Sequence, residues 1–234
     1  MNAALLTDCA LQLCTAAIEV DPLPPERLLA LSADPAAAFI SPRGQAWVGL
    51  GVARWLAPGA GTADALWAGL LDDSTDAPAP VALGALPFRA EETPDAVWQG
   101  LMPGGLMLPE RLYVQQGERA WWRLTLPVRD AGALQPRLAQ ARRTLATLAH
   151  AEADPVPAWQ PGAEGGSPQR YARAVTRAVE RIRQGELVKV VLARRGSVRF
   201  DTAPAPAALL ARLGAHHPDC VRYAWRRGGK TWLG

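Results

Sequence analysis

The spacing of apolar residues predicts two amphipathic helices, one on each side of a stretch rich in proline and glycine. In the first helix, over residues 133–149, apolar side chains recur at alternating spacings of four and three, at Leu134, Leu138, Ala141, Leu145 and Leu148. In the second, over residues 168–183, they recur at three and four, at Tyr171, Ala174, Val175, Ala178, Val179 and Ile182. Such spacings place the apolar residues on one helical face, so each helix should pack that face against other elements.

Strand patterns account for most of the remaining chain. Alternating or continuous apolar runs bounded by turn residues predict strands at 39–52, interrupted by a turn, and at 81–88. They also predict a hairpin of 106–115 with 119–126 and a second hairpin of 220–226 with 230–233. Shorter helices are expected at 63–71 and 207–213. Strands and helices that do not alternate regularly indicate the α+β class; the antiparallel sheets with outer helices that we also expect are implied by a family resemblance described below.

The order of these segments predicts three regions. Residues 1–150 form a sheet-plus-helix region, and residues 151–167 have the composition of a linker. Residues 168–234 then begin a second domain. Its first helix has Ser167 as a candidate cap and Gly185 at the position where a helix end favours a left-handed residue.

Lys189 is the one polar residue in the segment 187–193, which is otherwise apolar at both odd and even positions. A strand that is apolar on both faces is typical of a buried strand. The chain has 25 basic residues, and only Lys189 and Lys230 are lysines. Burial disfavours the ammonium form, and a lysine held neutral can accept a proton. Two interpretations follow: a general base, or a lysine at a strand end that extends its ammonium group to water.

The stretch Tyr171–Arg194, with Gly185-Glu186-Leu187 and the run Lys189-Val-Val-Leu-Ala-Arg194, resembles the chorismate-utilising enzymes and, among them, isochorismate synthase. The resemblance implies the fold of that family, whose members include anthranilate synthase component I. It implies chorismate as the substrate and Lys189 as the residue that activates the attacking water. The anthranilate branch usually has glutamine at this place, whereas salicylate synthases also keep a lysine, so the salicylate alternative stays open. The implied product, isochorismate, is used in menaquinone or siderophore biosynthesis.

The same resemblance implies that the chain corresponds to the N-terminal half of such an enzyme. Thr231-Trp232-Leu233-Gly234 matches the strand that, in the family, leads directly into an Ala-Ser-Pro-Glu motif. The glutamate of that motif is the family's general acid, and the glutamates that bind Mg²⁺ follow further along. We therefore expect a truncated chain that lacks both and is inactive alone. A non-catalytic fragment or interaction module derived from the family is the alternative.

Composition excludes several other classes of function. The formal net charge of +3 is small and scattered, and no RNA- or DNA-binding motif is present, so nucleic acid is not an expected partner. No apolar stretch is long enough to span a membrane, and no signal peptide is evident. Three unpaired cysteines, Cys9, Cys14 and Cys220, indicate free thiols in a reducing compartment, and we expect a cytoplasmic protein. His216 and His217 have no carboxylate at ligand spacing, which favours a polar turn over a metal site.

Overall fold

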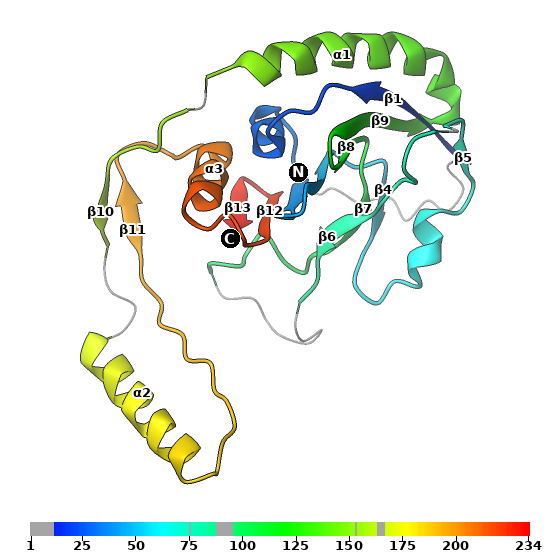
Figure 1. Ribbon diagram of the computed structural model, residues 1–234. Coiled ribbons are helices and arrows are strands. Elements are labelled where there is room, and N and C mark those ends of the chain that lie inside the picture. Colours follow the sequence, from blue (N-terminus) through cyan, green and yellow to red (C-terminus); the bar gives the residue numbers. More distant parts are fainter. Residues whose placement is uncertain (1–11, 75, 88–95, 153, 163–166) are drawn as a thin grey trace. The chain divides into compact units, whose positions relative to one another are not determined.

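The computed structural model describes residues 12–74, 76–87, 96–152, 154–162 and 167–234 (Figure 1). The chain divides into two compact units. Unit 1 comprises Met1–Asp154 together with Ala205–Gly234, and unit 2 comprises Pro155–Pro204. The last thirty residues therefore pack with the first part of the chain, although a separate unit intervenes in the sequence.

Unit 1 is built on an eight-stranded sheet with the order β13-β12-β2-β3-β8-β9-β1-β5. Neighbouring strands are antiparallel, except that β5 pairs with β1 in parallel. The strands are β1 (Leu13–Val20), β2 (Ala36–Ile40), β3 (Gln45–Leu50), β5 (Leu70–Asp72), β8 (Arg111–Gln116), β9 (Arg119–Pro127), β12 (Arg222–Arg227) and β13 (Lys230–Leu233). The expected hairpins β8–β9 and β12–β13 are confirmed, as are the strands and turn of β2–β3.

A smaller sheet of three strands, in the order β4-β7-β6, packs with apolar side chains from β2 and β12. Its strands are β4 (Arg54–Leu56), β6 (Leu83–Ala85) and β7 (Gly105–Leu108). The expected strand at 106–115 is divided into β7 and β8, and Pro109 stands at the division. Proline lacks the backbone N–H that a continuous ladder requires. The helix expected at 63–71 is a single 3₁₀ turn, η2 (Ala63–Leu66), that leads into β5.

Helices cover one face of the large sheet. The helix α1 (Leu134–His150) lies along β1 and β9 (Figure 1), where it buries Leu134, Leu138 and Leu145 as its spacing predicted. The helix α3 (Pro206–His216) packs against β12 and against the 3₁₀ helix η1 (Pro25–Ala30). A further 3₁₀ helix, η3 (Val128–Ala133), connects β9 to α1. The apolar residues between these helices and the sheet form the largest core cluster.

The β12–β13 hairpin is fastened to the N-terminal part of unit 1 by hydrogen bonds as well as by pairing with β2. The Asp34 carboxylate accepts hydrogen bonds from the backbone N–H groups of Gly228 and Gly229, both at 3.0 Å. Both glycines have positive φ, which the tight turn requires and other residues rarely adopt. The guanidinium of Arg226 donates to the carbonyl oxygens of Leu29 and Leu31 at 3.0 and 3.2 Å.

Unit 2 contains the helix α2 (Pro168–Arg183) and a two-stranded ribbon of β10 (Trp159–Pro161) and β11 (Val198–Phe200). None of its described residues is buried. The predicted helix is confirmed, but the buried strand predicted at 187–193 is wrong for this structure: the segment has no ladder partner among the described residues and is mostly exposed. A strand needs a neighbour for its backbone N–H and C=O groups, and apolar side chains on both faces do not supply one.

Candidate functional site

The helix α2 begins at Pro168 and is capped by Ser167, as the sequence predicted. The hydroxyl of Ser167 accepts a hydrogen bond from the N–H of Arg170 at 3.4 Å, and Pro168 occupies the first turn. Both features satisfy the needs of a helix start, where backbone N–H groups lack partners within the helix. The start of α2, the helix that precedes Lys189, is thus determined by residues next to it in the sequence.

The end of α2 is also set locally. Gly185 has a φ of +77°, the left-handed conformation expected after a helix. Its N–H donates to the carbonyl of Ile182, and the N–H of Glu186 donates to the carbonyl of Arg181, both at 3.0 Å. The side chains of Arg181 and Glu186 form an ion pair at 2.7 Å. This closure turns the chain sharply just before the segment that carries Lys189.

Lys189 itself is exposed, in a segment that has neither helix nor strand structure. The neighbouring side chains of Val188 and Val191 are 98% and 80% exposed. Within the part of the chain that the structure describes, Lys189 makes no hydrogen bond and no ion pair. A lysine that acts as a general base is usually buried or lies beside a charged group. Among the described residues, Lys189 is neither buried nor part of an ion pair.

A shallow cavity of about 270 Å³ lies between the first turns of α2 and the segment after Lys189. The hydroxyl of Tyr171 donates to the carbonyl of Leu192 at 3.5 Å and links its two walls. Arg170, Arg194 and Arg195 line it, and its described lining includes no carboxylate, so its charge suits an anion. Lys189 is not among the lining residues.

The described residues do not fit a Mg²⁺ site. Magnesium prefers oxygen ligands such as carboxylates. No group of three or more His, Cys, Asp or Glu side chains comes together across the described ranges. His216 ends α3, and its Nδ1 lies 2.9 Å from the carbonyl oxygen of Arg212.

A buried polar cluster in unit 1 was missed at the level of sequence. Arg123, on β9, is 1% exposed, and its guanidinium donates to the Asp72 carboxylate at 2.8 Å and to the Pro78 carbonyl at 2.7 Å. It also donates to the hydroxyl of Thr15, which the hydroxyl of Thr125 reaches at 3.1 Å. All the guanidinium contacts are to protein groups, so the cluster fastens the 72–78 loop to the sheet rather than offering a free charge. A signal similar to that at Lys189 occurs at Arg123, which is the one charged residue in a run that is apolar apart from Thr125, and it could have found the cluster.

The two cysteines that the structure describes are free, as expected from the sequence. Cys14 is buried on β1, and burial raises the pKa of its thiol, which favours the protonated, unreactive form. Cys220 is exposed, and Cys9 lies outside the described residues. Among the described helices, none combines the length and the apolar character needed to cross a bilayer.

Comparisons with known proteins agree on a family and a fold. The family described as "Chorismate binding enzyme" matches residues 11–234. The fold matches the solved structure of MenF, the menaquinone-specific isochorismate synthase from Escherichia coli, with a TM-score of 0.54 and 19% sequence identity. That match covers 96% of this chain and 50% of the MenF chain, so the chain spans about half the length of the structure it resembles. No curated protein matches the chain.

Proposed function

Because the chain belongs to the chorismate-binding enzyme family, we propose that it forms part of an enzyme that converts chorismate to isochorismate. The observation that carries the proposal is Lys189, a lone lysine between apolar residues in the segment that resembles isochorismate synthases. The anthranilate branch usually has glutamine there, and glutamine cannot accept a proton from water. A salicylate synthase, which also keeps a lysine at the matching place, is the alternative within the family.

The proposed reaction needs one base and one acid. Lys189, uncharged, takes a proton from water while the water oxygen bonds to C2 of the chorismate ring. The ring double bonds shift, the C4–O bond breaks, and an acid protonates the departing hydroxyl to give water. We assign the base to Lys189 and place the acid in the other half of the fold, because the family's glutamate follows the strand that Gly234 matches.

Burial of Lys189 is the condition for this role. An ammonium group in water keeps its proton at neutral pH and cannot act as a base. The apolar residues around Lys189 are exposed, and the apolar face of α2 is half-exposed. Both features support the proposal that the other half of the fold covers this surface. Covering it would desolvate Lys189 and favour its neutral form. The same half would supply the Mg²⁺ ligands, so no step is assigned here to the metal.

The test uses the assembled enzyme, in which this chain is joined after Gly234 to the second half of the E. coli enzyme. Chorismate is added with Mg²⁺, and isochorismate is quantified by chromatography. Lys189→Gln removes the base but keeps a polar side chain of similar length, and should lower kcat by about 10²–10⁴-fold, the usual contribution of a general base. Lys189→Arg should fail equally, because a guanidinium stays protonated.

The chain offers a matched control in its other lysine. Lys230 lies on β13, and its ammonium group donates to the carbonyl of Ala96 at 2.8 Å. Lys230→Gln should leave kcat within about twofold, since surface substitutions usually have small effects. Near-normal turnover with glutamine or arginine at 189 would remove the catalytic assignment.

An interaction module is the second candidate, and the exposed apolar face of α2 favours it. In that case the α2 face would bind a protein partner, and Lys189 would have no chemical role. Lys189→Gln would then leave partner binding intact, and the joined enzyme would produce no isochorismate even with Lys189 in place.

A further inference from the structure

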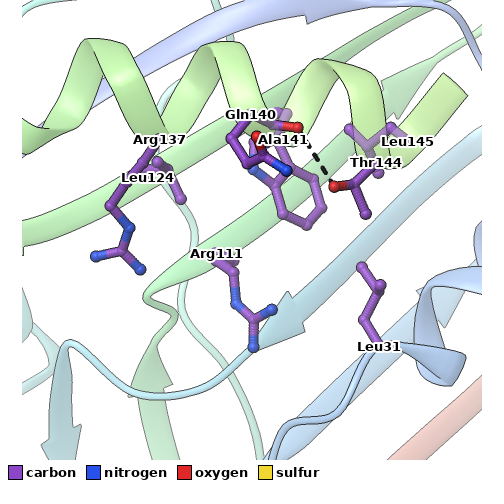
Figure 2. Close-up of a pocket in the computed structure, with 9 residues that line it drawn as sticks. Leu31, Arg111, Leu124, Arg137, Gln140, Ala141, Thr144 and Leu145 are labelled. Carbon is purple, nitrogen blue, oxygen red and sulfur yellow. Dashed lines mark hydrogen bonds between the residues drawn. The ribbon is translucent and has the colours of Figure 1, made fainter.

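A cavity in unit 1 has features that the proposed reaction does not use. It lies between α1 and the large sheet and has a volume of about 170 Å³ (Figure 2). Its lining residues are Leu31, Arg111, Trp122, Leu124, Arg137, Gln140, Ala141, Thr144 and Leu145. All of them belong to unit 1, so the cavity is complete without unit 2.

Register within the sheet explains why these side chains meet. Arg111 on β8 is paired with Leu124 on β9, and Tyr113 is paired with Trp122. Residues two apart in a strand point to the same face, so Arg111, Trp122 and Leu124 all face α1. The helix contributes residues one turn apart, from Arg137 to Leu145, which close the other side.

The walls are mainly apolar and of a size suited to one ring. Leu124 and Leu145 are buried, and Leu31 closes the cavity from the loop after η1. An apolar cavity of about 150 Å³ in another protein is large enough to bind benzene. A ligand of one six-membered ring therefore matches the volume here.

Trp122 provides a hydrogen-bond donor that has no partner. The side chain is 2% exposed, and its indole N–H is buried without a hydrogen bond within the described structure. A buried donor without a partner is costly and is rare in native structures. The indole nitrogen has almost no accessible surface, so a ligand in the cavity would contact the Trp122 ring rather than its N–H.

Two arginines give the cavity its charge. In Figure 2 the side chains of Arg111 and Arg137 extend from the sheet and from α1 on the same side of the cavity. Arg137 is neutralised by an ion pair with Glu110. Arg111 donates to the Ser32 carbonyl at 3.1 Å but has no carboxylate partner among the described residues. One uncompensated guanidinium suits a ligand with a single negative charge, and its planar fork matches a carboxylate.

We propose that this cavity binds a small monocyclic carboxylic acid, with its ring among Leu31, Leu124 and Leu145 and its carboxylate on Arg111. The apolar walls select against inorganic anions, and the guanidinium selects against neutral rings. The proposal depends only on unit 1 and is independent of the role of Lys189.

The test is a calorimetric titration of the purified chain with sodium benzoate as the probe. A ligand of this size that fits well should bind with a dissociation constant on the order of 0.1–1 mM. Benzyl alcohol, which has the same ring without the charge, should bind at least about tenfold more weakly. Inorganic phosphate, which has charge without a ring, should not bind measurably.

Two variants locate the site. Arg111→Gln removes the cation at a surface-accessible position and should weaken benzoate binding about tenfold or more. Ala141→Leu fills the cavity from α1 and should abolish binding. Arg129→Gln makes the same charge change at an exposed arginine of η3 that does not line the cavity, and should leave binding unchanged.

Absence of benzoate binding to the folded chain at about 10 mM, ten times the weakest expected constant, would overturn the proposal. Binding that is equal in Arg111→Gln, Ala141→Leu and the unchanged chain would do the same, because it would place benzoate elsewhere. Circular dichroism and thermal melting of each variant confirm that it is folded before titration.

Discussion

The helices α1 and α2 have similar lengths and similar apolar spacings, yet only α1 buries its apolar face. In α1, Leu138 is 1% exposed and lies within the largest core cluster. In α2, the apolar stripe is 37–40% exposed at Tyr171, Val175, Val179 and Ile182. The pattern of a helix shows which face needs cover, but the cover itself comes from tertiary partners. Unit 1 contains those partners for α1, whereas the described residues cover the apolar face of α2 only in part.

The comparison extends to polar groups. Unit 1 buries the Arg123 cluster and fastens the β12–β13 hairpin through Asp34 and Arg226. In unit 2, both side chains of the ion pair between Arg181 and Glu186 are exposed to solvent. Exposed pairs contribute little to stability, and buried ones are costly to break. The stability of the chain should therefore reside in unit 1.

The largest expected effect comes from breaking the buried cluster. Arg123→Met keeps the volume of the side chain but leaves the Asp72 carboxylate and the Pro78 carbonyl without their donor. We expect the free energy of unfolding of the whole chain to fall by up to about 5 kcal/mol, measured by urea denaturation; the Asp72 carboxylate, which is 32% exposed, keeps part of its hydration and so limits the loss. As the control, Arg119→Gln changes another arginine of β9, which forms an exposed ion pair with Glu19 of β1, and should leave the free energy of unfolding nearly unchanged. Equal losses in the two variants would contradict the account.

The next largest effect should come from the core face of α1. Leu138→Ala leaves a cavity in the main cluster and should lower the free energy of unfolding by about 2–5 kcal/mol. Urea denaturation followed by circular dichroism measures the change. A loss below about 1 kcal/mol would show that α1 is not packed as the structure has it.

The smallest effect is expected on the equivalent face of α2. Val175→Asp places a charge on the half-exposed stripe, and in the chain alone it should change stability by no more than about 0.5 kcal/mol. In the joined enzyme the same charge should oppose packing of the two halves, because burying an unpaired carboxylate is costly. Size-exclusion chromatography and thermal melting of both forms test this. Destabilisation of the chain alone by as much as Leu138→Ala would mean that α2 is already covered.

Local features of the fold follow from the sequence, and long-range ones follow only in part. The limits of α2, its Ser167 cap and its Gly185 end depend on neighbouring residues and were predicted. The β8–β9 and β12–β13 hairpins were predicted because their turns contain the glycines that such turns need. The segment at 187–193 was predicted as a buried strand, since its pattern carries no information on whether a partner strand is present.

The cavity residues could not be predicted, for a related reason. Arg111, Trp122 and Arg137 are ordinary when read singly in the sequence. They meet because β8 and β9 pair in one register and α1 lies across them. Lys189 could be singled out from the sequence because a lone lysine between apolar residues is visible from the adjacent residues alone. Its proposed chemical role, in contrast, depends on whether another part of the fold buries its side chain.

Chemical labelling of the two lysines tests that role most directly. An amine-reactive ester is added to the chain alone and to the joined enzyme, and mass spectrometry follows modification at each site. In the chain alone, Lys189 and Lys230 are both exposed, so both should react readily. In the joined enzyme, modification of Lys189 should slow by about tenfold or more as it becomes buried, while Lys230 serves as the internal reference and reacts as before. Equal reactivity of Lys189 in the two forms would contradict the account, because a lysine that stays in water would not be the base.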